Sequence, residues 1–559
     1  MISPRTWQAS SSLIGCALAF GFASSSAGSV SPEQLWKPPD GEWPTYHGDS
    51  SGEHFSPLSQ INRATLSRLG LVWTVRPSTA RAGAIVGAPA GDSAMQSASV
   101  AFPAQLKATP LVSGGVIYMV VGPQIHALDA RNGNAIWRYH WNNPVGTPLG
   151  RGVALYKDSV IAQTGLDNHV VSLDAKTGQE RWRVQVTDST LGYGGTTAPI
   201  LAGKHLILGM GGDGNNLRAW LESRDPDSGE LQWRWYVTPS AGQPGIETWP
   251  DAATAARGGG MPWQQVTYDP VLDLIYVPTA NPVPTFNARV RAGDNLYTNC
   301  IVALHAATGQ MAWYFQTTPN DTHDYDATQV PLLIDAAIDG RPRKLLAQVN
   351  RNGYYYLFDR MTGKSIVTVP YISTVNWAKG INANGQPIPN PDKTPQPGGA
   401  LVSPMSDGAA NYPPPSYSPA TRLVYAQTSS SYSLYYLNPE EDKPLGWGGG
   451  SEYHTGYGVS ALIGLEYATG RIAWKHDYPG PGFLSSVYPG TLSTGGGLLF
   501  TGDPAGNFVA FSAKNGEPLW HSGIGKVRNT PITYVLDGRQ YILVATDENL
   551  FAFALNDKY

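Results

Sequence analysis

Aromatic, carboxylate, amide and guanidinium side chains are concentrated in five segments between residues 258 and 360. Carboxylates can take a proton from a substrate, and carboxylate and amide oxygens are the ligands that hard cations take. These segments are therefore the first place to search for a catalytic site. They read GGGMPWQQVTYDP (258–270), IYVPTANPVPTF (275–286), RAGDNLYT (291–298), TPNDTHDYDATQ (318–329) and NRNGYYYLFDR (350–360).

Composition restricts the kind of protein that carries these segments. Only 14% of the 559 residues are charged, and 38 basic against 42 acidic side chains leave a net charge of -4. A near-neutral chain without a run of basic residues lacks the positively charged patch of a nucleic-acid binder, so we exclude that class of protein. The 63 Gly and 45 Pro exclude a long-helix protein, and the 42% hydrophobic content excludes a disordered one. We expect a compact, turn-rich, all-β protein.

A repeated unit organises the chain. Each copy is an apolar strand, a turn of the D-x-x-T-G type whose glycine supplies a positive φ, and a second strand that in six copies begins near a Trp. The copies are ALDARNGNAIW (127–137), SLDAKTGQERW (172–182), SRDPDSGELQW (223–233), ALHAATGQMAW (303–313), LFDRMTGKSI (357–366), GLEYATGRIAW (464–474) and AFSAKNGEPLW (510–520). Clear copies lie about 45–55 residues apart, the length of a four-stranded propeller blade.

The spacing predicts an all-β, eight-bladed β-propeller in which the repeated Trp docks one blade against the next. The gap from Asp359 to Glu466 is about two repeats long, so a degenerate unit containing SYSPATRLVYA (416–426) should fill it. The strand leading to Trp73 and the C-terminal strands bring the number of blades to eight. We expect these strands to pair and so to join the two ends of the chain. We expect residues 28–559 to form this single domain, decorated by long loops at 78–104, 379–400 and 438–457.

Residues 1–27 are typical of a secretory signal peptide. Arg5 is followed by an apolar run over about residues 13–22 and by small residues, and this run is too short to span a bilayer. The tetrapeptide that ends at Cys16 also resembles a lipoprotein cleavage box, but the apolar run continues past it, so a lipid anchor is the minor alternative. We predict a periplasmic protein whose one remaining cysteine is Cys300.

The five segments and both ends of the mature chain resemble the pyrroloquinoline quinone (PQQ) dependent alcohol dehydrogenases. WPTYHGDSSGEHFSPLSQIN (43–62) resembles the opening of that family, and PGTLSTGGGLLFTGDPAGNFVAFSAKNGEPLW (489–520) resembles its closing blades. The resemblance implies an eight-bladed periplasmic quinoprotein that oxidises an alcohol, or a related hydroxyl or aldehyde substrate, with PQQ and either Ca²⁺ or a lanthanide ion. PQQ is a planar tri-anion, so it needs a flat aromatic surface, cationic or amide donors and a Lewis acid.

The resemblance also implies a role for each matching residue. Asp324 would be the catalytic base, Arg351 would hold the reduced quinone oxygen, and Trp263 would form the floor under PQQ. Further cofactor contacts would come from Arg151, Thr196, Gly211, Gly212, Asn411 and Lys107, and the metal ligands would be Asn281, Asp324, Asp326 and Asp213. Each of these residues also has an ordinary structural reading, as a core Trp, a turn residue, a strand-end cap or an ion pair.

Five positions depart from the family pattern. Gly214 stands where the family has a metal-binding glutamate, and the adjacent Asp213 is the expected substitute. Residues 145 and 146 are Val and Gly rather than paired cysteines, so the family's vicinal disulfide cannot form. Lys107 replaces a glutamate, and His323 replaces a Trp before the base. These departures concern the metal and the substrate more than the fold.

The leading interpretation is a haem-free PQQ dehydrogenase. The chain has no C-x-x-C-H haem motif, so its electrons would pass to a separate soluble cytochrome c. The alternative is a propeller scaffold or binding protein without metal-dependent turnover, which the missing glutamate favours. A hydrolase or lyase would need a nucleophile motif of its own, and the sequence contains none.

Overall fold

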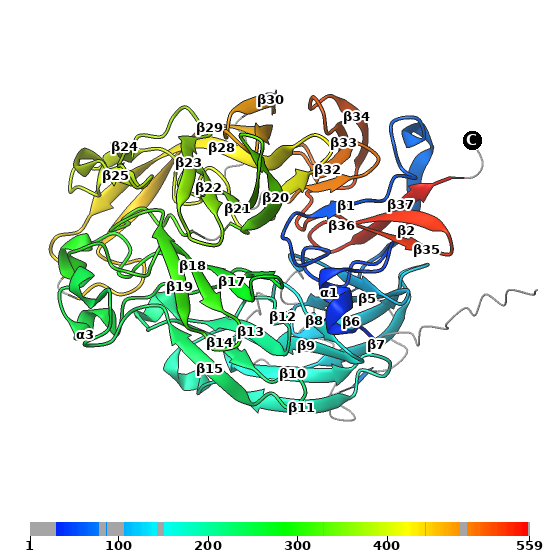
Figure 1. Cartoon of the computed structure of the whole chain (residues 1–559), viewed down its shortest axis with the longest axis horizontal. Helices are drawn as coiled ribbons and strands as arrows, with labels where there is room; N and C mark the ends of the chain where they lie inside the picture. Colours follow the sequence, from blue (N-terminus) through cyan, green and yellow to red (C-terminus); the bar gives the residue numbers. More distant parts are fainter. Residues whose placement is uncertain are drawn as a thin grey trace, which may run out of the picture.

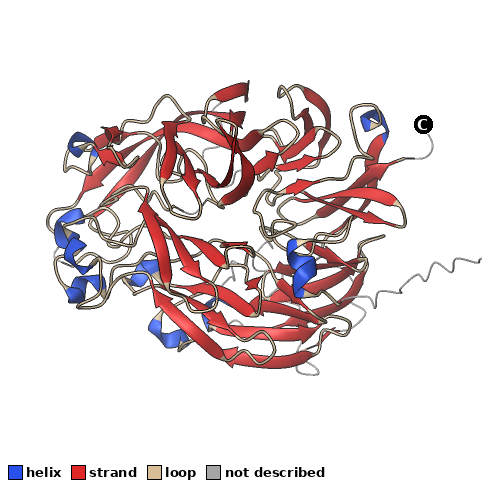
Figure 2. Cartoon of the chain, viewed as in Figure 1, coloured by secondary structure: helices blue, strands red, loops and turns tan. Residues whose placement is uncertain are grey.

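Eight sheets of four or five strands follow one another in chain order around a common centre (Figure 1) in the part of the chain that the structure describes. This computed structural model describes residues 29–77, 85–86, 106–141, 150–327, 329–441, 443–480 and 489–556. Strands dominate the molecule, and the helices are short (Figure 2). The predicted eight-bladed propeller is confirmed. The predicted signal peptide, residues 145–146 and most of segment 78–104 lie outside the described residues.

The first four blades each contain a four-stranded antiparallel meander. Blade 1 consists of β4 (Leu111–Ser113), β5 (Val116–Val121), β6 (Gln124–Asp129) and β7 (Ala135–His140), with β3 (Ile85–Val86) parallel to β7. Blade 2 consists of β8 (Ala154–Tyr156), β9 (Ser159–Gln163), β10 (His169–Asp174) and β11 (Glu180–Gln185). Blade 3 consists of β12 (Ile200–Ala202), β13 (His205–Met210), β14 (Trp220–Arg224) and β15 (Leu231–Tyr236). Blade 4 consists of β16 (Thr267–Asp269), β17 (Leu274–Pro278), β18 (Cys300–His305) and β19 (Met311–Gln316).

The last four blades include the elements that close the ring. Blade 5 consists of β20 (Leu332–Ile338), β21 (Arg341–Val349), β22 (Tyr354–Asp359) and β23 (Ser365–Pro370). Blade 6 consists of β26 (Ala400–Val402), β27 (Ser416–Ser418), β28 (Leu423–Leu437), β29 (Gly450–Glu466) and β30 (Ile472–Asp477). Blade 7 consists of β31 (Leu492–Thr494), β32 (Leu498–Gly502), β33 (Asn507–Ser512) and β34 (Pro518–Gly523), with β1 (Phe55–Ser56) parallel to β31. Blade 8 consists of β35 (Ile532–Leu536), β36 (Arg539–Ala545), β37 (Leu550–Leu555) and β2 (Leu69–Val75).

The ring is closed by strands from both ends of the chain. β2 pairs antiparallel with β37, so that Leu69 lies opposite Leu555 and Val75 opposite Leu550. The predicted joining of N- and C-terminal strands is therefore confirmed.

The repeated Trp docks neighbouring blades as predicted. Trp137 of blade 1 donates from Nε1 to the Ala175 carbonyl of blade 2 at 2.9 Å. Its ring lies against Gly178, where an added Cβ would come within 2.6 Å of the indole, and this glycine has φ +72°. The turn thus needs glycine both for its backbone and for space. Corresponding pairs are Trp182 with Gly229, Trp233 with Gly309, Trp313 with Gly363 and Trp474 with Gly516, and Trp73 with Gly133 links blade 8 to blade 1.

Blade 6 is the predicted degenerate unit, and it differs from the expectation in one respect. β28 and β29 are 15 and 17 residues long, and their ladder continues to the pair Leu437 and Gly450. The predicted loop 438–457 is therefore shorter, because its second half continues the strand. Segment 379–400 carries β24 (Ala378–Ile381) paired with β25 (Pro387–Pro389).

The segment that precedes β1 contacts strands of blades 1, 5 and 6. Trp43 bridges Val112 of blade 1, and the Ser51 carbonyl accepts from Leu333 N of blade 5 at 2.7 Å. The Glu53 carbonyl accepts from Tyr417 N of blade 6 at 2.8 Å. The helix α1 (Pro32–Trp36) precedes this segment. No described helix combines the length and apolar character needed to cross a membrane.

Candidate active site

Five of the predicted site residues come from loops of blades 2, 4 and 5. Arg151 precedes β8, Trp263 precedes β16, and Asn281 follows β17. Asp324 lies in the connection between β19 and β20, and Arg351 lies in the turn between β21 and β22. Residues far apart in the sequence therefore meet only because the blades are arranged around one centre (Figure 1).

Arg351 joins the two predicted carboxylates. Its Nη2 donates to Asp324 Oδ2 at 2.9 Å, and its Nη1 donates to Asp326 Oδ2 at 2.8 Å. The side chains of Arg351, Asp324 and Asp326 are only 7%, 17% and 6% exposed. A third bond, from Arg351 Nε to the Ser406 carbonyl at 2.7 Å, fixes the plane of the guanidinium.

Asp326 connects this ion pair to the other predicted ligands. Trp263 Nε1 donates to Asp326 Oδ2 at 3.0 Å, and the backbone N–H of Asn281 donates to Asp326 Oδ1 at 2.7 Å. The structure thus brings Trp263, Asn281, Asp324, Asp326 and Arg351 together.

Asp324 and Asp326 share one positively charged partner, Arg351. Burial raises the pKa of Asp324 well above its usual value, and the Arg351 guanidinium opposes this rise. Burial likewise raises the pKa of Asp326, against the effects of Arg351 and of the donors on Asn281 and Trp263. One guanidinium does not compensate two buried carboxylates, so the site has the electrostatics of a place for a further cation.

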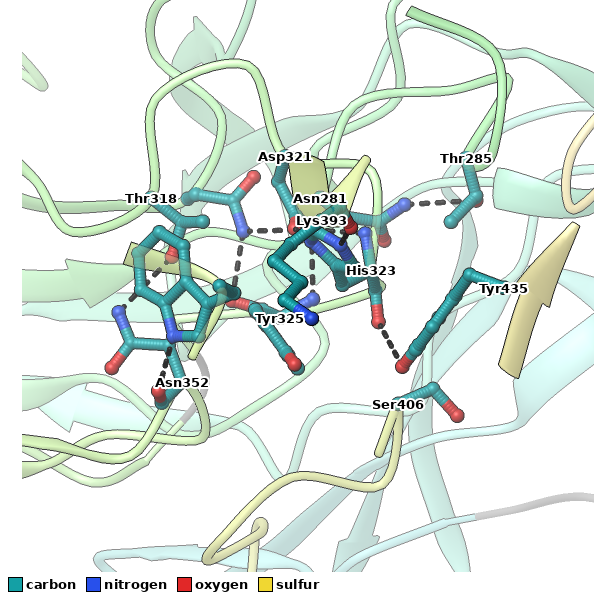
Figure 3. A network of polar contacts seen from close by, with 12 residues as sticks. Asn281, Thr285, Thr318, Asp321, His323, Tyr325, Asn352, Lys393, Ser406 and Tyr435 are labelled. Atoms are coloured by element: carbon teal, nitrogen blue, oxygen red, sulfur yellow. Dashed lines mark hydrogen bonds and ion pairs between the residues drawn. The ribbon is translucent and has the colours of Figure 1, made fainter. Parts of the chain in front are cut away.

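The loop that carries Asp324 is shaped by the buried carboxylate of Asp321. Asp321 Oδ1 accepts from His323 N at 3.0 Å, and its Oδ2 accepts from Tyr325 N at 2.7 Å. His323 Nε2 lies 2.7 Å from the Lys393 carbonyl, which can only accept, so this nitrogen carries the proton (Figure 3). These bonds hold Asp324 at φ +66°, in the left-handed region.

Arg151 covers the face of Trp263. Its Cζ lies 4.4 Å from the centre of that ring and 5.2 Å from the centre of the Tyr412 ring. Arg151 Nη1 donates to Thr196 Oγ1 at 2.6 Å, as expected if both residues face one site. Arg151 Nε is buried and has no partner among the described residues. Burial lowers the pKa of Lys107, and the nearby positive charge of Arg151 adds to this effect, so Lys107 belongs to the same cationic region.

Three other predicted cofactor contacts have structural roles in the protein itself. Asn411 uses its amide within its own loop, donating to the Asp407 carbonyl at 2.8 Å and accepting from Tyr412 N at 2.7 Å. An added Cβ on Gly211 would come within 2.5 Å of Met261, and one on Gly212 within 2.6 Å of Leu217. Close packing already requires both glycines, so the structure gives them no separate role toward a ligand.

Two of the predicted metal ligands, Asn281 and Asp324, each offer an oxygen atom that no described donor uses, whereas both oxygens of Asp326 accept hydrogen bonds. Asn281 Nδ2 donates to the Pro282 carbonyl and to Thr285 Oγ1, both at 3.0 Å, which leaves Oδ1 free. No group of three or more His, Cys, Asp or Glu among the described side chains is placed to hold a metal. The available set is therefore two carboxylates and one amide, all of which are hard-cation ligands.

The position of the missing glutamate has room for a side chain. Around Gly214, the one heavy atom within 4 Å of an added Cβ is Trp447 Cζ3 at 3.6 Å. Asp213 begins the short turn η4 (Asp213–Asn215), and its side chain lies outside the described part of the structure. Its predicted role as a substitute ligand stays a prediction.

Sequence reasoning missed three residues that shape this site. Asp321 is one, and the signal was its place at the start of the D-T-H-D-Y-D run, where a carboxylate can cap the following N–H groups. Tyr412 is the second, and its neighbour Asn411 was singled out instead. Glu452 is the third, because it accepts from Ser406 N at 2.9 Å and so supports the carbonyl that holds Arg351. No local pattern marks Glu452.

The eight-bladed fold places the chain in the class of β-propeller proteins, and comparison with known proteins gives the family. The family described as "Glucose/ethanol/alcohol dehydrogenase, beta-propeller domain" matches residues 43–396. A second family, "Outer membrane protein assembly factor BamB", matches residues 453–558, the last blades.

Individual relatives agree with the first family. The quinohemoprotein alcohol dehydrogenase ADH IIB of Pseudomonas putida is 33% identical over 539 residues, covering 90% of this chain and 73% of its own length. The 1-butanol dehydrogenase (cytochrome c) of Thauera butanivorans is 31% identical over 553 residues, covering 90% and 74%. The structure of a europium-containing methanol dehydrogenase superposes with a TM-score of 0.80 at 26% identity, covering 94% of this chain and 100% of that one. The chain belongs to the PQQ-dependent alcohol dehydrogenase family.

Proposed function

We propose that this chain is a periplasmic dehydrogenase that oxidises an alcohol, or a related hydroxyl or aldehyde substrate, with bound PQQ and a hard cation. The observation that carries the proposal is the Arg351 guanidinium, which joins Asp324 and Asp326 at 2.9 and 2.8 Å beside Trp263 and Asn281. Family membership supports the same reading.

The cofactor region fits a planar anion. Trp263 offers a flat ring, and Arg151 and Lys107 offer positive charge, with the buried Nε of Arg151 still without a partner in the described chain. PQQ, when bound, supplies the quinone carbon that takes a hydride from the substrate. Trp263 would then pack on one face of that plane, and Arg151 would donate to a carboxylate at its edge.

The cation region fits Ca²⁺ or a lanthanide ion. Asn281 Oδ1 and the carboxylates of Asp324 and Asp326 would hold the ion, with Asp213 as a further candidate. A bound cation would supply Lewis-acid polarisation of an oxygen. The raised pKa values of the two carboxyls are what such an ion would lower.

The residues themselves provide the acid–base chemistry. Asp324 would take the proton of the substrate hydroxyl while the adjacent carbon loses its hydride. Arg351 would keep the Asp324 carboxylate oriented and would stabilise negative charge that develops on a nearby oxygen. The two electrons carried by the hydride would then leave one at a time to a separate cytochrome c, because the chain has no haem motif. The name of the Thauera relative supports this choice of acceptor.

The test is reconstitution of the purified mature chain with PQQ and either Ca²⁺ or La³⁺, followed by dye-linked oxidation of an alcohol panel. We expect PQQ retention and dye reduction with at least one ion. Failure with both ions would overturn the enzyme proposal and favour the scaffold alternative, for which the match of the last blades to BamB is the supporting observation.

A further inference from the structure

The orientation of the Asn281 amide is set by one carbonyl. One terminal atom of this side chain lies 3.0 Å from the Pro282 carbonyl oxygen. A carbonyl oxygen can only accept a hydrogen bond, so that atom must be the amide nitrogen. The other atom, Oδ1, is therefore the one available to a ligand, and no donor among the described residues reaches it.

Thr285 completes this orientation. Its Oγ1 lies 3.0 Å from the same Asn281 nitrogen, and Figure 3 shows the two side chains joined. The Pro282 carbonyl and the Thr285 hydroxyl together use both hydrogens of the amide. A rotated amide would place its oxygen against the Pro282 carbonyl and would lose that bond, so the carbonyl selects the orientation. The Thr285 hydroxyl can accept or donate, and its bond to the same terminal atom fixes the position of the amide group.

Thr285 is itself held rigidly from two sides. Its N–H donates to the Gly446 carbonyl at 2.7 Å, and its carbonyl accepts from Arg291 Nη2 at 2.8 Å. Arg291 is completely buried and also donates from Nε to the Pro284 carbonyl at 2.9 Å and from Nη2 to the Asp321 carbonyl. Arg291, from the segment RAGDNLYT, therefore links the loop that carries Asn281 and Thr285 to the loop that carries Asp324.

The same loop that anchors Thr285 also anchors the turn after Gly214. Gly446 N donates to Asn216 Oδ1 at 2.6 Å, and Asn216 Nδ2 donates to the Pro444 carbonyl at 3.1 Å. Through Gly446 and Asn216, Thr285 is therefore connected to the turn that carries Asp213 and Gly214.

We propose that Thr285 is a positioning residue for the cation: it holds the Asn281 amide with Oδ1 toward the metal. This inference rests on the proposed metal site. Partners that hydrogen-bond a metal ligand and fix its orientation typically change metal affinity by about 10–100-fold when they are removed.

The experiment compares Thr285→Val with Thr285→Ser in the full mature chain. Metal affinity is measured by titrating chelator-treated protein with Tb³⁺, read by luminescence, and with Ca²⁺, read by calorimetry. Thr285→Val removes the hydroxyl at constant shape and should raise the Kd at least about 10-fold. Thr285→Ser keeps the hydroxyl and should stay within about twofold of the wild type, because the partner of the amide is retained.

A matched control separates positioning from general stability. Thr533 is also buried, and its hydroxyl donates to a backbone carbonyl, that of Tyr541, at 2.7 Å in blade 8. Thr533→Val should lower the melting temperature without changing metal affinity. Unchanged affinity in Thr285→Val would overturn this inference alone, whereas a wild-type chain that binds neither ion would overturn the proposed metal site as well.

A double-mutant cycle keeps the inference falsifiable if Thr285→Val is poorly folded. In Asn281→Ala the side chain that Thr285 holds is absent. Thr285→Ala should therefore weaken metal binding at least about 10-fold in the wild-type background and by much less in the Asn281→Ala background. Equal effects in the two backgrounds would overturn the inference.

Discussion

The guanidinium of Arg151 lies 4.4 Å above the centre of the Trp263 ring, although the two residues come from different blades. A cation over the face of an indole is favourable, and both residues are partly buried. Arg151 is also held by Thr196 at 2.6 Å, while its Nε has no partner in the described chain. The pair therefore presents one flat surface and one unused charged donor, which is what the edge of a planar tri-anion requires.

Arg151→Met should weaken PQQ binding by about 10- to 150-fold, since a hydrogen bond to a charged group contributes about 1.5–3 kcal/mol. The measurement is quenching of tryptophan fluorescence during a PQQ titration. Arg234→Met is the matched control, because Arg234 lies at the same 4.4 Å over Trp220 but on the outer strand of blade 3. A Kd equal to that of the wild type in Arg151→Met would show that another group binds the cofactor carboxylate.

Asp324→Asn should keep PQQ bound but lower kcat at least about 100-fold, because general-base catalysis contributes about 10²–10⁴-fold. The amide preserves the shape of the side chain and removes only the proton acceptor. Steady-state dye reduction and the bound-PQQ absorbance, measured on the same sample, check both halves of the prediction. Asp335→Asn changes a 63% exposed carboxylate on β20 and should leave kcat near that of the wild type. Full turnover in Asp324→Asn would assign the base elsewhere.

The fold could be predicted from the sequence because its determinants are local and repeated. Each copy of the short motif contains a turn glycine and, in most copies, a Trp, and the Trp of one copy docks on the glycine of the next, as Trp137 docks on Gly178. The extension of β28 and β29 was not visible, because their pairing depends on a long ladder rather than on a turn motif.

The sequence indicated candidate residues for the site, but it did not indicate the hydrogen bonds that join them. Asp324 and Asp326 stand in one short run, but the donors that reach Asp326 come from Trp263 and Arg351, which are 63 and 25 residues away in the sequence. Such contacts depend on how loops of several blades meet, and a single sequence does not encode that geometry locally. For the same reason the support that Ser406 gives to Arg351 could not be found.

The contribution of Asp324 to the stability of the metal-free protein should fall as the pH rises. Burial raises the pKa of this carboxyl, so the folded state binds its proton more tightly than the unfolded state does. Its stabilising contribution is complete below the unfolded pKa, about 3.9, and is lost as the pH rises through the higher folded pKa. The difference in melting temperature between the wild type and Asp324→Asn, measured in chelator from pH 4 to 8, should therefore become less favourable to the wild type.

A bound cation should remove this dependence, because it stabilises the ionised carboxylate. Repeating the series with Ca²⁺ or La³⁺ should give a smaller change with pH than the chelator series. A difference between wild type and variant that is independent of pH in chelator would mean that Asp324 titrates alike in the folded and unfolded states.

Gly214→Glu should increase affinity for the cation. The backbone at Gly214 does not lie in the left-handed region, and an added Cβ would meet one heavy atom within 4 Å, Trp447 Cζ3 at 3.6 Å. A glutamate can therefore be accommodated, and an additional carboxylate ligand should lower the Kd for Ca²⁺ by about 10-fold or more. Calorimetric titration of Ca²⁺ and Tb³⁺ luminescence measure the change.

Two further variants decide how the ligand set is completed. Gly214→Gln has the same size without the charge and should give a smaller gain than Gly214→Glu, since ligand charge sets much of the affinity. Asp213→Ala should weaken metal binding in the wild-type background and much less beside Gly214→Glu, if Asp213 fills the place of the missing glutamate. Unchanged affinity in both Asp213→Ala and Gly214→Glu would mean that neither position faces the ion and that Asn281, Asp324 and Asp326 hold it without a third carboxylate.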